Sequence, residues 1–564
     1  MKYLFACIAI VLGVSGLAIR ASYPDLGSDV PVLYWVTDRN PARADQVAGF
    51  HRWLIANGHC TEVRVTTAQE LQDLLDGLAP TLLDDMVAAQ PELGRLLDKE
   101  SPDTSLLPAI VLVPLLEMRI DTANSDDVKQ TIQSVSGVGG DVMDVLFGSG
   151  LRKFESMGVL VDLTEDANAM GFGVDQTYPS LAPEITIDGR QFAFPCNANS
   201  DFLWVNPRLF EDNAIPAPPK RWTLEEFESL GVAFCAAANR AGERRQVFFL
   251  DRMPFEIVAR SLGVSVFNET MTASTLDDPG YAEMLDLAWR WMYDLNILPT
   301  PDDEDSFSVS QGYKGAKLQL FGAGNYAMVL GGRYFLLQFR AFEALGEFAA
   351  VEIPHGGFPN TNAESRLATI YKGSEHPELA KLFLAYLTSE GYNRMIVDSA
   401  DALPPNPAFT QDTAYLRPPD HPKEWGVHGV AAEAALSLAV ANEYSPFVLP
   451  TVVVREVEFV RDEFLIGRLT SAQAAARTAA VIDQEIRREI ARKPGLRPEY
   501  DRRLSLQERI DARKAKGERI PENWVLNPFL RAYYGHTDRL TAPEPVSIES
   551  DISELANPAV GGSA

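Results

Sequence analysis

Apolar runs that end in polar loops form the first regular pattern of the chain. Residues 32–36 are rich in β-branched and aromatic side chains, and the polar loop 37–41 that follows contains a proline suited to the start of a helix. From residue 42 to residue 57 apolar side chains recur at helical spacing, and Gly58 supplies a C-terminal stop. The pattern predicts a strand, a loop and a helix, which together begin an α/β sheet.

The same alternation returns further along the chain. Residues 117–121 and 141–145 predict strands, and residues 127–135 predict a helix between them. Strands that alternate with helices are typical of a mostly parallel sheet, in which ligands bind beyond the carboxyl ends of the strands. The loops 37–40 and 144–150 are therefore expected to share one rim.

The stretch between these loops predicts an added subdomain. Residues 66–116 contain leucines at helical spacing and are interpreted as a helical insertion. Within them, residues 106–116 form the longest apolar run after the N-terminus. That run is too short for a membrane span and contains two prolines, so it is interpreted as a buried core segment.

The first residues predict export. Lys2 precedes an apolar run from residue 4 to residue 19, which fits a secretory signal cleaved after Ala18 or Ala21. Arg20 follows that run directly, and an uncleaved N-terminal anchor is the alternative. The predicted location is periplasmic or extracytoplasmic.

Composition narrows the function classes. The 564 residues exceed what one core organises, so two or more lobes are expected. A net charge of −28 argues against nucleic acid or an anionic membrane surface as a partner. After the leader only Cys60, Cys196 and Cys235 remain, without a CxxC pair; one disulfide is conceivable, and buried free thiols are favoured. The acidic run 302–305 lacks the glycine and ligand spacing of a calcium loop, so neither a metal nor another cofactor is predicted.

An ordered series of short motifs resembles the family 1 extracellular solute-binding proteins, typified by the maltose-binding protein. The motifs lie, in chain order, at residues 136–145, 157–164, 178–179, 187–190, 194–195, 205–210, 218–227, 324–334, 378–387 and 403–405. Each motif alone is weak, but their order and spacing are specific, and the resemblance extends over about residues 32–490.

The resemblance implies a fold and a function. The fold would be α/β and periplasmic-binding-protein-like, with two lobes joined by three hinge crossings near residues 194–199, 351–354 and 403–405 and a ligand cleft between them. The protein would capture a carbohydrate, in the first place an oligosaccharide, by closing its lobes, and would deliver it to the permease subunits of an ABC transporter. A monomer without catalytic activity is expected.

The resemblance also sets the expected domain boundaries. They are residues 1–21 for the signal or anchor, 22–197 and 354–403 for lobe 1, 198–353 and 404–495 for lobe 2, and 496–564 for a C-terminal extension. The extension has a basic helix at 502–516, whereas residues 541–564 contain few large apolar groups and are expected to be disordered.

Two residues stand out as ligand contacts by their match to the family. Tyr334 follows Gly331-Gly332-Arg333 at the family's aromatic position and would stack on a sugar ring; the alternative is a core tyrosine. Asn199 lies where the maltose-binding relative has a hinge glutamate, and its amide could bind a pair of hydroxyls or simply hold the turn.

The remaining candidates come from loops and strand ends. Thr37, Asp38, Arg39 and Asn40 correspond to the first ligand loop, where a carboxylate beside a guanidinium could bind polyol hydroxyls or form a solvated salt bridge. Further candidates, each with a structural alternative, are Asp144 and Phe147 after the third strand, Trp204, which strand alternation could equally bury, and Arg333, which could pair with a sugar acid or a local carboxylate.

Rival classes remain open. An exported glycan-acting hydrolase could use any pair of the 78 acidic residues, but HExxH and GxSxG motifs are absent from the sequence. A binder of a non-sugar solute and an envelope scaffold are two further classes.

Overall fold

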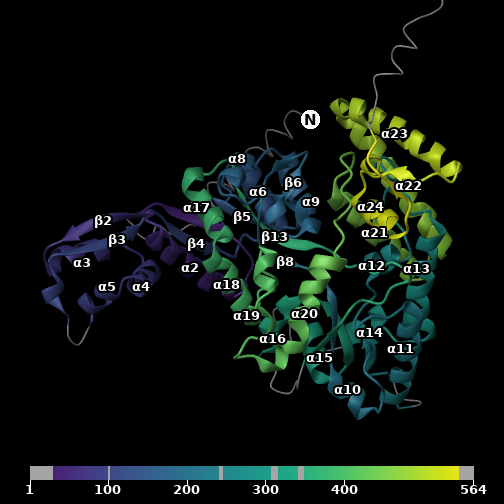
Figure 1. Ribbon diagram of the computed structural model, residues 1–564, viewed down its shortest axis with the longest axis horizontal. Helices are drawn as coiled ribbons and strands as arrows, with labels where there is room; N and C mark the ends of the chain where they lie inside the picture. The colour runs from purple at the N-terminus through teal and green to yellow at the C-terminus, as the bar shows by residue number, and fades with distance from the viewer. Residues whose placement is uncertain (1–29, 99–101, 241–244, 307–315, 341–347, 545–564) are drawn as a thin grey trace, which may run out of the picture. The chain divides into compact units, whose positions relative to one another are not determined.

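The computed structural model describes residues 30–98, 102–240, 245–306, 316–340 and 348–544 (Figure 1). The predicted export signal and residues 545–564 lie outside them. Backbone contacts divide the chain into two compact units. The first consists of Met1–Ile257, Ala288–His355 and Pro359–Ala441, and the second of Val258–Leu287, Gly356–Phe358 and Asn442–Ala564.

The first unit contains a five-stranded sheet with the order β4-β1-β5-β13-β8. Its strands are β1 (Val32–Val36), β4 (Glu117–Asp121), β5 (Val142–Leu146), β8 (Phe194–Asn199) and β13 (Glu364–Ile370). β1 is parallel to β4 and β5, whereas β13 is antiparallel to β5 and β8. The three strands predicted from the alternating pattern are confirmed to within one residue and are mutually parallel. The late strands, which that pattern did not include, make the sheet mixed.

Helices from both ends of the sequence cover this sheet. They are α2 (Ala42–Ala56), α6 (Asp127–Ser136), α7 (Phe147–Ser156), α17 (Pro377–Thr388) and α18 (Glu390–Ser399). α2 contacts β4, and α17 contacts β13 and β8. Trp35, Phe50 and Phe383 pack together in the core between them, with Trp35 and Phe383 ring centroids 4.8 Å apart. The helices predicted at 42–57 and 127–135 are confirmed.

A second sheet has the order β10-β11-β9-β12. Its strands are β9 (Phe202–Val205), β10 (Phe248–Leu250), β11 (Tyr326–Gly331) and β12 (Ala349–Val351). Its core is aromatic, since Trp204 packs against Phe202, Phe339 and Phe348. The other helices and strands of this unit are α8 (Thr164–Ala169), α9 (Ala182–Ile185), β6 (Thr186–Ile187), β7 (Arg190–Gln191), α10 (Pro207–Asp212), α11 (Leu224–Ala238), α14 (Pro301–Ser306), α15 (Ala316–Ala323), α16 (Leu336–Phe339), α19 (Thr413–Leu416) and α20 (Trp425–Glu433).

The chain passes between the two sheets at three places. β8 leads into β9 through residues 200–201, and β12 leads back to β13 through residues 352–363. After Leu403, which pairs with Ala198 of β8, the chain reaches α20, which packs on β12. These passages lie at or beside the positions that the resemblance implies. That they bend as hinges stays a prediction.

The inserted subdomain contains strands as well as helices. Its helices are α3 (Ala68–Asp76), α4 (Pro80–Ala89) and α5 (Pro91–Leu96), and its strands β2 (Cys60–Val65) and β3 (Ala109–Pro114) pair antiparallel. The interpretation of residues 66–116 as helical therefore needs correction at its C-terminal end. The run 106–116 is also only half buried: Val111 and Val113 lie in the subdomain core, whereas Ile110 is 61% exposed, because successive side chains of a strand point to opposite faces.

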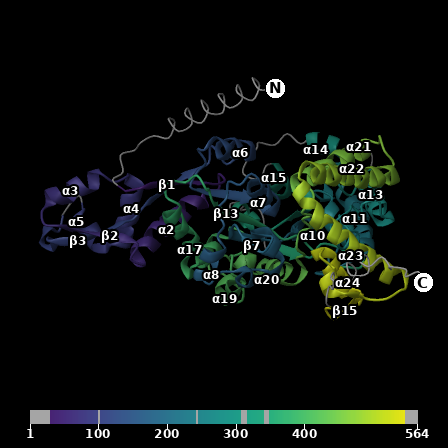
Figure 2. The same cartoon turned by 90° about the horizontal axis from the view of Figure 1, so that it is seen from above.

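The second unit holds most of the C-terminal part of the chain (Figure 2). Its elements are α21 (Pro450–Leu465), α22 (Ser471–Arg492), α23 (Arg497–Ala515), β14 (Ile520–Pro521), α24 (Pro528–His536) and β15 (Leu540–Thr541), while α12 (Phe255–Ser261) and α13 (Pro279–Trp289) extend over the boundary between the units. Within the described residues, no helix is long and apolar enough to cross a membrane.

A buried carboxylate holds the C-terminal extension to the earlier segment of this unit. Glu269 accepts hydrogen bonds from Gln507, Lys514 and Tyr534, each at 2.7 Å. Burial raises the pKa of Glu269, but the donors from Lys514 and Tyr534 outweigh burial and hold it below its usual value. The extension is therefore folded through β15, and the basic helix predicted at 502–516 is part of α23.

Candidate functional site

Buried polar side chains meet where β1, β5 and β13 lie side by side. Asp144 of β5 accepts a hydrogen bond from Trp35 Nε1 at 2.7 Å and others from the Thr37 hydroxyl and the Arg366 guanidinium. Thr37 and Asp144 are 0% and 6% exposed. The structure thus brings two predicted site residues together, and both are engaged by neighbours within the protein.

Asp401 continues this group from a segment far away in the sequence. Its carboxylate accepts from Arg43, from Asn40 Nδ2 at 3.1 Å and from Gln46 Nε2 at 3.1 Å, and it lies 3.6 Å from Arg366 Nη2. Burial raises the pKa of Asp401, but the charges of Arg43 and Arg366 lower it to about 2. We call Asp38, Arg43, Asp144, Arg366 and Asp401 the ion-pair network.

Residues of the predicted first ligand loop, 37–40, contact the ion-pair network or belong to it. Asp38 pairs with Arg43 Nε at 2.7 Å, and although burial raises the pKa of Asp38, the charges of Arg43 and Arg366 hold it below its usual value. Asn40 is 4% exposed, and its Oδ1 accepts from the amide of Ala42 at the start of α2. Arg39 differs from its neighbours because its side chain is exposed.

A second polar group lies at the passages between the sheets. Asn199 at the end of β8 donates through Nδ2 to Asp201 and to Glu364, at 3.3 Å each. Asn362 Nδ2 donates to Glu364 at 2.8 Å and to Asp201 at 3.3 Å. Two carboxylates therefore share two neutral amides. We call Asn199, Asp201, Asn362 and Glu364 the crossing cluster.

The two acidic side chains of the crossing cluster have little counter-charge within the protein. Burial, then the charge of Asp201 and, to a smaller extent, that of Glu256 raise the pKa of Glu364 to about 8. Arg252 is the cation paired with Asp201, at 4.0 Å. The buried Oδ1 of Asn199 has no hydrogen-bond partner among the described residues. Because an unmet buried acceptor is costly, this arrangement favours a partner that donates hydrogen bonds and disfavours an anionic one.

The turn after β11 lies directly against this cluster. A Cβ at Gly332 would be 1.6 Å from Asn199 Oδ1, so only glycine allows this close approach. Tyr334, two residues later, is half-buried, packs beside the aromatic core and meets Phe335 edge-on with ring centroids 4.9 Å apart. The predicted residues Asn199 and Tyr334 thus belong to one neighbourhood.

Two other predicted site residues, Arg333 and Trp204, lie buried in the protein. Arg333 is 1% exposed and donates to the carbonyls of Ala402 at 2.8 Å and Val397 at 2.7 Å, and to His428 Nδ1 at 3.1 Å. Burial lowers the pKa of Arg333. Trp204 is 1% exposed, and its Nε1 donates to the carbonyl of Gly332 at 3.2 Å. These contacts favour the structural alternative for both residues.

Phe147 lies apart from these groups. It opens α7 with a φ of 60°, which is unusual for a residue with a side chain, and it is 38% exposed. The preceding Leu146 is 57% exposed. An exposed apolar pair at the end of β5 agrees with the rim position expected for Phe147, and a ligand contact there stays a prediction.

Sequence reasoning missed the residues that complete both groups. Arg43, Arg366 and Asp401 close the ion-pair network, and Asp201 and Glu364 supply the charge of the crossing cluster. The signal in the sequence that could have identified these residues was a charged residue beside an apolar run predicted to be a strand. Within the ion-pair network, contacts join residues as far apart as 222 and 358 positions in the sequence, so spacing could not pair them.

Metal and thiol chemistry have little support in the described part of the chain. No three His, Cys, Asp or Glu side chains there are grouped closely enough to hold a metal ion. Cys60, Cys196 and Cys235 are free thiols. Burial raises the pKa of the Cys235 thiol to about 11, so it stays protonated near neutral pH.

Several solved structures share this fold. An ABC substrate-binding protein from Listeria monocytogenes in complex with cycloalternan is 16% identical, with a TM-score of 0.60, and the match covers 82% of this chain and 100% of that chain. Maltose-bound MalE3 of T. maritima is 15% identical, with a TM-score of 0.56 and coverages of 81% and 99%. UgpB from Mycobacterium tuberculosis in complex with glycerophosphocholine is 15% identical, with a TM-score of 0.55 and coverages of 72% and 97%. These likenesses confirm the predicted fold class.

The sequence was compared with curated proteins and with family models. No curated protein matches it. Residues 116–394, however, match the family described as bacterial extracellular solute-binding protein, and they contain strands of both sheets and the crossing cluster. The family match and the shared fold together confirm the predicted resemblance of this chain to the extracellular solute-binding proteins.

Proposed function

We propose that this protein captures a carbohydrate outside the cytoplasm by closing its two lobes around it, and that it delivers this ligand to an ABC transporter permease. An oligosaccharide is the favoured ligand. The family match and the relatives solved with cycloalternan and maltose support this proposal. Export by residues 1–21 belongs to the proposal, and a reporter fused after residue 30 should reach the extracytoplasmic space.

The crossing cluster is the observation that carries the proposal. It lies at two of the passages between the sheets, where a ligand that contacts both lobes would favour the closed state. Two carboxylates and the unmet Oδ1 of Asn199 are acceptors for hydroxyl donors. Tyr334, in the turn that touches Asn199, would cover the apolar face of a sugar ring.

The charge of the cluster separates ligand classes. A neutral polyol can donate hydrogen bonds to Asp201 and Glu364, whereas the carboxylate of a uronic acid would bring a negative charge to a group whose acids have little counter-charge. A sugar acid is disfavoured for the same reason, since Arg333 is engaged by backbone carbonyls. A neutral sugar therefore fits better than an anionic solute.

A hydrolase is the second candidate because one observation favours it. The carboxylates of Asp201 and Glu364 are close, and Glu364 has a raised pKa, as a general acid requires. Both carboxylates are bound by amides that also suit a passive binding role. The same oligosaccharides should therefore be tested for turnover and for binding.

The direct test is a panel of neutral oligosaccharides, with glycerophosphocholine as a zwitterionic comparison and a uronic-acid oligomer as an anionic comparison. A true ligand at about 100 times its Kd should raise the stability of the protein by about 2.7 kcal/mol. Small-angle scattering should show a smaller radius of gyration with the ligand, and chromatography should recover that ligand unchanged. An unchanged radius at saturation would contradict lobe closure, and product formation would favour the hydrolase.

Tyr334→Ala sharpens this test. Loss of a stacking ring should weaken binding of the sugar about tenfold to a hundredfold, equivalent to about 1–3 kcal/mol. Tyr334→Phe keeps the ring and should bind nearly normally. Calorimetric titration and a melting curve on each variant separate the roles: a large loss of melting temperature with unchanged affinity would show that Tyr334 serves the core.

A further inference from the structure

One face of α23 carries a row of arginines beside a pocket. The pocket has a volume of about 340 Å³, and its lining includes Arg502, Arg503 and Arg509 together with Leu506 and Leu526. Arg513 lies one helical turn beyond Arg509 on the same face. We call Arg502, Arg503, Arg509 and Arg513 the arginine row.

The positive charge of this row is only partly neutralised. Arg502 and Arg503 share one carboxylate, that of Glu499. Arg509 lies over the ring of Trp524 at 4.3 Å and forms no ion pair with any other residue that the structure describes. The row therefore adjoins an apolar pocket and can accept further carboxylates.

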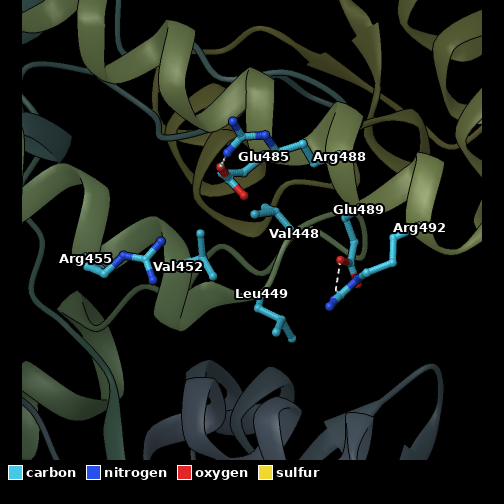
Figure 3. Close-up of a pocket in the computed structure, with 8 residues that line it drawn as sticks. All are labelled: Val448, Leu449, Val452, Arg455, Glu485, Arg488, Glu489 and Arg492. Carbon is cyan, nitrogen blue, oxygen red and sulfur yellow. Dashed lines mark hydrogen bonds and ion pairs between the residues drawn. The ribbon is translucent and has the colours of Figure 1, made fainter. Parts of the chain in front are cut away.

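An arginine pocket between α21 and α22 shows the opposite situation (Figure 3). Its arginines pair with glutamates close by in the sequence. Figure 3 shows the pairs of Arg488 with Glu485 and of Arg492 with Glu489, and Arg455 pairs with the adjacent Glu456. Its charges are therefore balanced locally. This pocket provides a matched control for the arginine row.

Glu544, the last described residue, already contacts the arginine row at Arg513. Glu544 Oε2 lies 2.7 Å from Arg513 Nη2. The backbone of Glu544 also binds the side chain of Asn523, which lines the pocket, through an N–H···Oδ1 bond of 3.0 Å and an Nδ2–H···O bond of 2.8 Å. The described chain therefore ends at the rim of the pocket.

The segment that follows has the chemistry to continue along the row. Residues 545–564 contain Glu549, Asp551 and Glu554, but no lysine or arginine. Ile548 directly precedes the first of these acids, and Ile552 follows the second. Arg513 and Arg502 are about 16 Å apart along a helix. Five to seven extended residues span about 17–24 Å, so Glu549 and Asp551 can reach Arg509 and Arg502.

We propose that residues 545–555 of this same chain bind along the arginine row. Glu549 and Asp551 extend the ion pair that Glu544 begins, and Ile548 and Ile552 cover Leu506 and Leu526. A segment whose composition predicts disorder would thereby order on a preformed surface. This inference is independent of the sugar-binding proposal.

Hydrogen exchange compares the full chain with a version that ends at Glu544. Peptides covering residues 502–509 and 523–526 should exchange faster in the shortened protein. Glu549→Lys with Asp551→Lys in the full chain should have the same effect without altering α23. Arg488→Glu in the control pocket should leave exchange at 502–509 unchanged.

A synthetic peptide of residues 545–560 tests the contact in trans. It should bind the shortened protein, and Arg509→Glu should weaken this binding about tenfold, while loss of a single ion pair should weaken it about twofold to fivefold. Arg509→Glu combined with a peptide carrying Glu549→Arg should recover most of the affinity.

Three results would overturn the proposal. The first is equal exchange in the two chain lengths together with no peptide binding. The second is protection by inorganic phosphate equal to that by the peptide, which would make the row a site for free anions. The third is protection in the full chain that grows with protein concentration, which would assign the contact to a second copy.

Discussion

The ion-pair network and the crossing cluster both contain buried acidic side chains, but their surroundings shift the pKa values of Asp401 and Glu364 in opposite directions. In the network, Arg43 and Arg366 lie against three aspartates, and the pKa of Asp401 falls to about 2 even though burial raises it. In the crossing cluster, neutral amides join two carboxylates, and burial raises the pKa of Glu364 to about 8. The comparison shows that burial of a carboxylate does not by itself indicate a site. What distinguishes the two regions is whether the protein supplies the counter-charge.

This difference assigns the two regions different tasks. A network with paired charges holds the first sheet to α2 and to the segment after α18. The crossing cluster keeps one unmet acceptor, Asn199 Oδ1, so an added donor would stabilise it. The residue types of the predicted ligand loop suit sugar binding, but in this structure most of them serve the network.

The largest expected effect comes from removing a cation from the ion-pair network. Arg366→Met leaves Asp144 and Asp401 with less counter-charge in a buried place, and should lower the free energy of unfolding by about 3–5 kcal/mol. Urea denaturation measures this change. Arg39→Met, at the exposed position of the same loop as Asp38, should change stability by less than about 0.5 kcal/mol. Equal effects of the two substitutions on the free energy of unfolding would show that the buried ion pairs of Arg366 contribute no more to stability than an exposed arginine does.

Local patterns predicted most of the first sheet because its strands and helices are encoded by neighbouring residues. The runs around Trp35 and Val145, and the helix after Asp127, needed no distant partner. β13 was not foreseen as a strand of this sheet, since its pairing with β5 joins residues more than 200 positions apart. The strand inside the insertion was missed because a short apolar run fits either a helix or a strand.

The candidate site was less predictable than the fold. Family motifs led to Asn199 and Tyr334, which share a neighbourhood, but the same reasoning could not tell that Arg333 caps a chain segment or that Trp204 lies in the core. An arginine in the sequence does not reveal whether its guanidinium contacts backbone carbonyls or a ligand. The distinction depends on which atoms lie within about 3 Å, and only coordinates supply that.

A smaller effect is expected where the turn after β11 meets the end of β8. The Cβ of Gly332→Ala would collide with Asn199 Oδ1, although the φ of −95° at residue 332 suits alanine. Overpacking at this contact should cost about 1–3 kcal/mol of stability. Asn199→Gly in the same chain removes the obstructing side chain and should recover most of the loss. A double variant no more stable than Gly332→Ala alone would mean that the collision is relieved elsewhere, and that the crossing cluster is not tightly packed against this turn.

The dependence of stability on pH separates the two regions. Asp401 has a folded pKa of about 2 against an ordinary value of 3.8, so the stability that it contributes is present above about pH 4 and is lost as the pH falls toward 2. Glu364 has a folded pKa of about 8 against 4.5, so the folded state holds a proton that the unfolded state releases, and stability falls as the pH rises from about 4.5 to 8.

Glu364→Gln isolates the second of these contributions. The amide cannot ionise, so the decline in stability between pH 5 and pH 8 should flatten by about 3 kcal/mol, because each pH unit between the two pKa values is equivalent to about 1.4 kcal/mol. The acid limb below pH 4 should keep its shape because the ion-pair network is intact. Urea denaturation across pH 3–8 on both proteins measures the two limbs separately. Parallel profiles between pH 5 and pH 8 would show that Glu364 is ionised without penalty, and the crossing cluster would then resemble the ion-pair network in having its charge met within the protein.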